Sequence, residues 1–159
     1  MPEFVNGLPL HALVVHFVVV LLPLAVLGSV VVALWPAARA RFGWLVVGVA
    51  AVATLLVPVA TNTGGKLSER YPGNQLVTRH QELGDLMIYF AVPLLVFVTA
   101  LMVVHQWGSR LLANWTKIAT IIAAVLTIGF AVAAGVHVYR VGEAGSRAVW
   151  DGTQNLPTR

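Results

Sequence analysis

The chain has 159 residues, of which 58% are hydrophobic and only 10% are charged. A soluble domain carries about 25% charged residues, so a chain of this composition could not cover a water-facing surface. The net charge of +4 is small and is explained by basic residues that flank membrane spans, so we expect no nucleic-acid partner. The absence of cysteine excludes disulfides, thiolate metal sites and covalent attachment of a c-type haem.

Four long apolar runs predict four membrane-spanning helices. A helix that crosses the hydrocarbon core needs about 20 apolar residues. The runs lie at residues 10–35, 44–60, 86–104 and 118–139. They occupy more than half of the chain and leave no room for a separate soluble domain. The predicted fold class is therefore all-α, with residues 1–159 forming a single domain, an integral membrane up-and-down four-helix bundle.

Local signals mark the ends of these helices in chain order. Pro9 suits the first turn of the first helix. Gly64 and Gly65 would close the second helix with a left-handed cap. Residues 78–81 match a capping box, which would open the third helix. No internal repeat is evident in the sequence.

The alternation of four spans gathers four of the five histidines on one side of the membrane. The first and third spans start on that side, and the second and fourth end there. It holds His11, His16, His80 and His137, whereas His105 lies in the Trp-rich belt at the other side. Because His16 stands inside an apolar run, its imidazole has no water to bond and needs a protein or cofactor partner.

His16 and His80 are the leading candidate ligands. His11 and His16 are five residues apart, about 140° around a helix, so one helix does not present both to the same point. His16 also lies about 7.5 Å deeper than His11, where His80, His137 or both can match it in depth. Helix bundles build cofactor sites from side chains on facing helices. Two imidazoles without a cysteine suit a b-type haem, which carries the redox chemistry itself.

Two alternatives remain open beside the haem. For the haem, Arg79 and Arg140 stand next to His80 and His137, where they could pair with its propionates. The first alternative is a zinc or copper ion, which the imidazoles of His16 and His80 could also bind. The histidines could instead fasten helices together, in a non-catalytic accessory subunit of a larger membrane complex. Nothing resembles a nucleophile with its base or a nucleotide-binding motif, so we expect no independent enzyme activity.

Four segments occur in a distinctive order: HALVVHF at 11–17, GKL at 65–67, HQELGD at 80–85 and VYRVGEAGSRAVW at 138–150. Together they resemble a family of small bacterial four-helix membrane proteins, common in actinobacteria, the domain of unknown function 2231. The resemblance covers nearly the whole chain. It implies a membrane protein whose signature is the paired histidines of the first span and the histidine of the third.

The resemblance also bears on function. Relatives occur fused to Rieske iron–sulfur or cytochrome-like domains, which implies electron transfer in a respiratory chain. The implied partners are the lipid bilayer, other membrane or redox proteins, and a second copy of the chain. One departure concerns Glu143, since many relatives have Gly-His-Ser-Gly where this chain has Gly142-Glu143-Ala144-Gly145. If that histidine is a ligand in the relatives, Glu143 would replace it poorly on a haem.

The charges at the span ends predict which side the histidines occupy. The two short links carry Arg39, Arg41, Arg110 and Lys117 and no acid, whereas the opposite side carries six bases and all six acids over many more residues. The first helix usually dominates orientation, and it has Glu3 before it and Arg39 and Arg41 after it. We therefore predict a cytoplasmic (inner) membrane protein with both termini and the histidine cluster on the extracytoplasmic side.

Single cysteines introduced at Ser68 and Ser109 test this topology. We expect a membrane-impermeant thiol reagent to label Ser68→Cys but not Ser109→Cys on intact cells, because only Ser68 lies on the predicted outer side. Labelling of both variants after permeabilisation is the control. The reverse pattern would move the histidine cluster to the cytoplasmic side.

Overall fold

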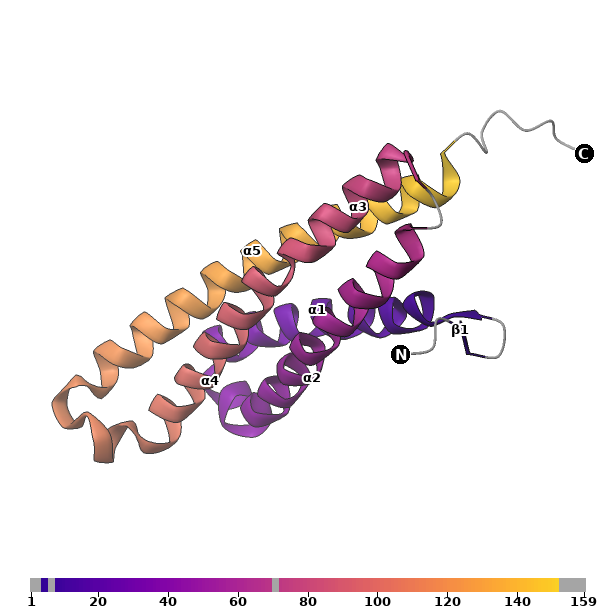
Figure 1. The fold of residues 1–159 in the computed structure, drawn as a ribbon. Coiled ribbons are helices and arrows are strands. Elements are labelled where there is room, and N and C mark those ends of the chain that lie inside the picture. The colour runs from indigo at the N-terminus through magenta and orange to yellow at the C-terminus, as the bar shows by residue number, and fades with distance from the viewer. Residues whose placement is uncertain (1–3, 6–7, 70–71, 152–159) are drawn as a thin grey trace, which may run out of the picture.

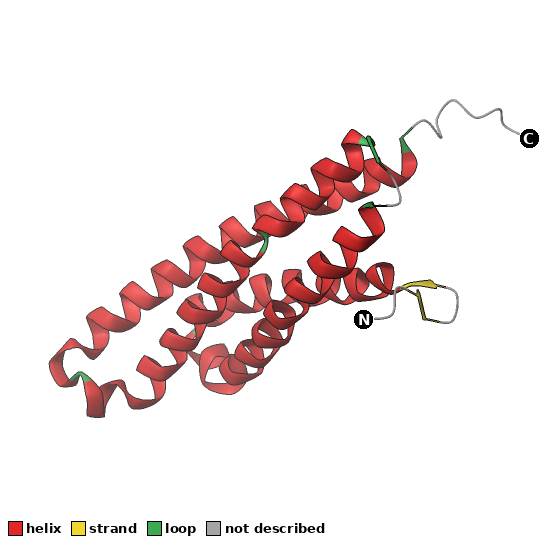
Figure 2. Cartoon of the chain, viewed as in Figure 1, coloured by secondary structure: helices red, strands yellow, loops and turns green. Residues whose placement is uncertain are grey.

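The fold is that of a computed structural model, which describes residues 4–5, 8–69 and 72–151 (Figure 1). Its helices are α1 (Leu10–Leu34), α2 (Pro36–Ser68), α3 (Gln75–Leu86), α4 (Ile88–Leu111) and α5 (Thr116–Trp150), with a 3-10 turn, η1 (Ala113–Trp115), before α5. A two-residue antiparallel ladder of β1 (Phe4–Val5) and β2 (Leu8–Pro9) precedes α1. Glu3, used above to predict topology, lies outside the described residues. Helices dominate the described chain (Figure 2), which confirms the predicted all-α class.

The helices are long and apolar enough to form four membrane spans: α1, α2, α3 with α4, and α5. Only 22% to 33% of the residues in the most apolar window of each span are buried inside the bundle. Large apolar side chains such as Leu24, Leu55 and Val125 are more than half exposed. An apolar surface of this extent marks contact with a membrane rather than with water. The predicted membrane bundle is therefore confirmed.

Two of the local signals for helix ends were wrong, and α5 also continues to Trp150, past the end predicted at 139. Gly64 lies inside α2, which continues to Ser68. α3 begins before the capping box expected at 78–81, because the Asn74 side chain accepts hydrogen bonds from the backbone N–H groups of the second and third residues of the helix. Backbone hydrogen bonding does not depend on an apolar side chain. Both helices therefore extend beyond the apolar runs that predicted them.

The third span is broken at Met87 (Figure 2). The Met87 N–H donates to the carbonyl of Gly84, three residues back, at 3.0 Å, instead of to Leu83, four residues back. The Leu83 carbonyl thereby loses its usual helical donor. Inside a membrane a freed carbonyl has to find another donor within the protein. The break thus creates a polar group that a neighbouring helix must satisfy.

The two helical hairpins, α1–α2 and α3/α4–α5, repeat each other. Every buried residue of α1 has a buried counterpart 69 positions later (Val18 and Met87, for example), and the same shift relates His11 to His80. The α1 residues are Val18, Leu22, Ala25, Ser29, Val32 and Ala33, and their counterparts are Met87, Ala91, Leu94, Val98, Leu101 and Met102. α1 packs on α2 and α5, just as α4 packs on α5 and α2. The fold therefore has a pseudo-twofold relation that the sequence did not reveal.

The second helices of the two hairpins share a matching pattern. A shift of 81 positions carries Ala50 and Ala53 of α2 to Ala131 and Ala134 of α5, and all four are at most 1% exposed. Small side chains at these positions let the helices approach closely, as in other membrane bundles. The two hairpins therefore pack through equivalent surfaces.

Arg39 stabilises the turn between α1 and α2. Its side chain is 6% exposed, and it donates from Nε to the Val32 carbonyl at 2.8 Å and from Nη2 to the Ala33 carbonyl at 2.6 Å. The last carbonyls of a helix lack intrahelical donors, and a cation there also suits the helix dipole. The charge used above to predict topology therefore also caps α1.

A substitution at Gly43 tests the packing of α2 against α4. A Cβ atom at Gly43 would collide with Sδ and Cε of the buried Met102. We expect Gly43→Ala to lower the free energy of unfolding by about 1–3 kcal/mol, because it overpacks this contact. Gly48→Ala on the same helix is the matched control, since nothing lies within 4 Å of its Cβ position. Thermal unfolding in detergent measures both, and equal stabilities would contradict the packing.

Candidate functional site

His11 and His80 meet where the two hairpins come together. His11 lies in the first turn of α1 and His80 lies midway along α3, and both side chains are half-buried. Their ring centroids are 6.2 Å apart with an interplanar angle of 72°, an edge-to-face arrangement. Because the 69-position shift makes them equivalent, the two imidazoles face each other across the pseudo-twofold relation. They form what we call the histidine pair.

A backbone carbonyl orients each imidazole of the pair. Nδ1 of His11 lies 3.0 Å from the Ala60 carbonyl of α2, and Nδ1 of His80 lies 3.0 Å from the Val141 carbonyl of α5. A carbonyl oxygen can only accept, so each Nδ1 carries the proton and donates it. The lone pair of each ring is then on Nε2. Metal-binding histidines are oriented by this kind of Nδ1 hydrogen bond.

A glycine one turn after each acceptor makes room for the ring. Gly64 follows Ala60 by four residues, and Gly145 follows Val141 by four. A Cβ at Gly64 would lie 2.8 Å from Cε1 of His11, and a Cβ at Gly145 would lie 2.9 Å from Cε1 of the other histidine. Both distances are shorter than side chains tolerate. The sequence analysis missed this role, because it interpreted Gly64 as a helix end. The available signal was the four-residue spacing that Ala60 and Gly64 share with Val141 and Gly145.

His16 does not belong to the pair. It is exposed, and its Nδ1 lies 2.5 Å from the carbonyl of Ala12 on the same helix. His11 precedes the buried Val18 by seven residues and so shares the inward face of α1, whereas His16 precedes it by two and falls on the opposite face. The expected contact between His16 and His80 is therefore replaced by one between His11 and His80.

His137 acts at the break in the third span. Its side chain is buried, and its Nε2 donates to the Leu83 carbonyl at 2.8 Å, the carbonyl that the turn at Met87 releases. Its ring also stacks on Phe90, with centroids 4.3 Å apart and an interplanar angle of 18°. These contacts fasten α5 to both halves of the broken span. The position of His137 is thus explained by the Leu83 carbonyl, to which it donates a hydrogen bond.

The charged residues near the pair lie on the outer surface. Arg79 pairs with Glu82 at 3.6 Å, with side chains 67% and 62% exposed, and Arg140 is also exposed. Glu143 accepts a 2.6 Å hydrogen bond from Arg147, one turn later on α5. Glu143 stands where many relatives of the resembling family have a histidine. Because this position is exposed and occupied by an ion pair, the departure leaves the histidine pair intact.

The donor set limits the groups that the site could hold. Within residues 4–5, 8–69 and 72–151, no cluster of three or more His, Cys, Asp or Glu side chains is arranged to hold a metal ion. Within this described part of the chain, the histidine pair therefore offers two imidazoles to any group bound there.

Comparison with known proteins identifies one matching family. The model of the family described as "Predicted membrane protein (DUF2231)" matches residues 7–155. The matched region contains all four spans, both imidazoles of the pair and both glycines beside them. No curated protein and no solved structure matches the chain. The family description gives a membrane location and names no activity.

Removal of the His137 imidazole tests its structural role. We expect His137→Ala to lower the free energy of unfolding by about 1–3 kcal/mol, because the half-buried Leu83 carbonyl loses its donor. His105→Ala is the control, since His105 is exposed at the other end of the bundle. Unfolding of both variants in the same detergent measures the difference. A His137→Ala protein as stable as the control would contradict this role.

Proposed function

We propose that this chain, which belongs to the matched family of predicted membrane proteins, is an electron-transfer component of a respiratory chain with its redox centre at the histidine pair. The observation that carries the proposal is the geometry of His11 and His80, two imidazoles from different hairpins with Nδ1 anchored and Nε2 left as a lone pair. The charges of the short links support a cytoplasmic-membrane location with this centre near the extracytoplasmic face.

The separation of the two rings supports two ligands on one metal. A metal–nitrogen bond is about 2.0–2.1 Å long, and with the half-width of a five-membered ring on each side, two imidazoles facing one metal have centroids about 6 Å apart. The observed separation is 6.2 Å. Anchoring by the Ala60 and Val141 carbonyls would limit ring rotation and keep the tautomer that a metal needs.

A b-type haem is the group that the pair suits best. Zinc sites use three or four protein ligands, and the described residues offer two histidines here. A haem brings its own equatorial nitrogens and takes only axial ligands from the protein, and it supplies one-electron redox chemistry when bound. His11 and His80 would hold it. Arg79 and Arg140, exposed near the same end, would be available to its propionates.

One observation favours a second function, that of a non-catalytic accessory subunit. Three histidines, His11, His80 and His137, each bond a backbone carbonyl of another helix. Such bonds fasten helices without any cofactor, as polar side chains do in membrane bundles. In this alternative the pair is a structural contact, and the protein acts through other membrane proteins that bind its lipid-facing surface.

An optical spectrum of the purified protein separates the two functions. We expect protein from haem-replete cells to show a Soret band and a sharp α-band on reduction. His11→Ala and His80→Ala should each abolish both bands, because each removes an axial ligand. His16→Ala should keep them, since His16 lies on the opposite face of α1.

The control is His105→Ala, which removes an exposed imidazole at the other end of the bundle and should leave the spectrum unchanged. A colourless wild-type preparation without bound metal by elemental analysis would overturn the redox proposal in favour of the accessory subunit. Loss of the bands in His16→Ala with retention in His11→Ala would return the ligand role to His16.

A further inference from the structure

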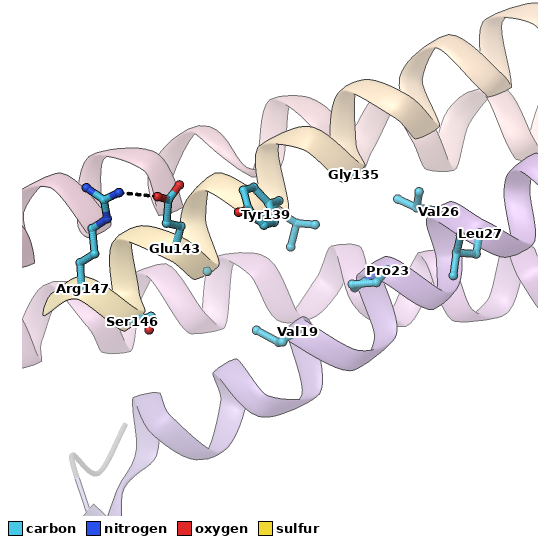
Figure 3. Close-up of a pocket in the computed structure, with 11 residues that line it drawn as sticks. Val19, Pro23, Val26, Leu27, Gly135, Tyr139, Glu143, Ser146 and Arg147 are labelled. Carbon is cyan, nitrogen blue, oxygen red and sulfur yellow. Dashed lines mark hydrogen bonds and ion pairs between the residues drawn. The ribbon is translucent and has the colours of Figure 1, made fainter. Parts of the chain in front are cut away.

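An open groove of about 690 Å³ lies between α1 and α5, beside the face of α1 that carries His11. Figure 3 shows Val19, Pro23 and Val26 of α1 along one side of it and Tyr139 and Glu143 of α5 along the other. The volume is within the range of about 300–1,000 Å³ that small-molecule sites occupy. The groove lies along two membrane spans, so a ligand would reach it from the lipid.

Two glycines of α5 line the groove, two turns apart. Gly135 lies where α5 contacts α1, because its Cβ would be 3.3 Å from Cγ1 of Val26, whereas nothing lies within 4 Å of the position that a Cβ of Gly142 would occupy. The 81-position shift relates these glycines to Thr54 and Thr61 of α2. Thr54 is buried and donates to the backbone of its own helix at 2.7 Å. Both hairpins contribute a histidine to the pair, but they differ on this face, where α5 has glycine and α2 has threonine.

Polar groups gather at one end of the groove and carry no net charge. Glu143 and Arg147 form an ion pair at 2.6 Å, and Tyr139 and Ser146 line the same stretch of α5. On α1, His16 precedes Val19 by three residues and so continues the face of α1 that lines the groove. Because Nδ1 of His16 donates to Ala12, its Nε2 presents a lone pair that can accept a hydrogen bond.

We infer that this groove binds a lipid-soluble quinone or its quinol. The apolar walls suit an isoprenoid tail, and the open space beside Gly142 suits a flat ring. The charge-balanced end suits an uncharged head that accepts and donates hydrogen bonds, and His16 Nε2 can accept from a quinol hydroxyl. Among the described residues that line the groove, Glu143 and Arg147 carry opposite charges and are paired, so a phospholipid phosphate would have to compete with the Glu143 carboxylate for Arg147. The inference does not depend on the redox centre, because the groove is lined by residues other than His11 and His80.

A substitution that fills the groove tests the inference. Gly142→Leu would project a side chain into open space without striking the protein, and Gly129→Leu is the matched control on the same helix, where nothing lies within 4 Å of the Cβ position and which does not line the groove. The probe is a decyl-substituted benzoquinone, with its Kd for the full chain in detergent measured by native mass spectrometry. We expect one quinone per chain, a Kd at least tenfold weaker in Gly142→Leu, and no change in Gly129→Leu.

Three outcomes would overturn the inference. The first is an equal Kd for the quinone in wild type and both variants. The second is a bound phosphatidylglycerol at this groove that the quinone does not displace, and the third is a dimer of the chain that Gly142→Leu dissociates. His16→Ala gives a second readout and should weaken quinone binding severalfold while leaving any Soret band unchanged. Quinone binding should also persist in His11→Ala, so that failure of this inference and failure of the proposed redox centre remain distinguishable.

Discussion

Hydrogen bonds from imidazoles to backbone carbonyls hold the histidine end of this bundle together. A bilayer provides no water to a polar group, so each donor and acceptor must be satisfied within the protein. His137 supplies the donor that the Leu83 carbonyl lost at the helix break, and His11 and His80 donate to carbonyls of α2 and α5. These contacts orient the pair, hold the neighbouring helices together and satisfy the carbonyl that the break in the third span releases.

The pseudo-twofold relation explains why the pair consists of two similar environments. Each hairpin contributes a histidine, an acceptor carbonyl and a glycine four residues after that acceptor, here Gly64 in α2 and Gly145 in α5. A site formed where equivalent elements meet therefore has one imidazole from each half. The glycines of α5 that line the groove have no glycine counterparts in α2, so they can serve a ligand that binds once per chain.

The pair and the groove lie on neighbouring faces of α1, because Val19, Pro23 and Val26 lie about 60–120° around the helix from His11. His11 and His16 are separated by five residues and by about 140° of helical rotation. Since a helix with its side chains is about 10–12 Å across, a quinone in the groove and a redox group at the pair would be close neighbours. The exposed Glu143 lines the groove. The departure that the family resemblance implies at this position therefore concerns the groove rather than the pair.

The sequence alone determined the membrane class, the four spans, the family resemblance and the side of the bundle that the histidines share, because these depend only on apolar run length and on the alternation of spans. It could not identify the partner of His80. That choice depends on which face of α1 turns inward, and this is decided by packing against α2 and α5. The roles of Gly64 and Gly145, the hidden repeat and the groove likewise appeared only in the tertiary structure. Each arises from the distance between helices that are far apart in the sequence, and hydropathy carries no information about that distance.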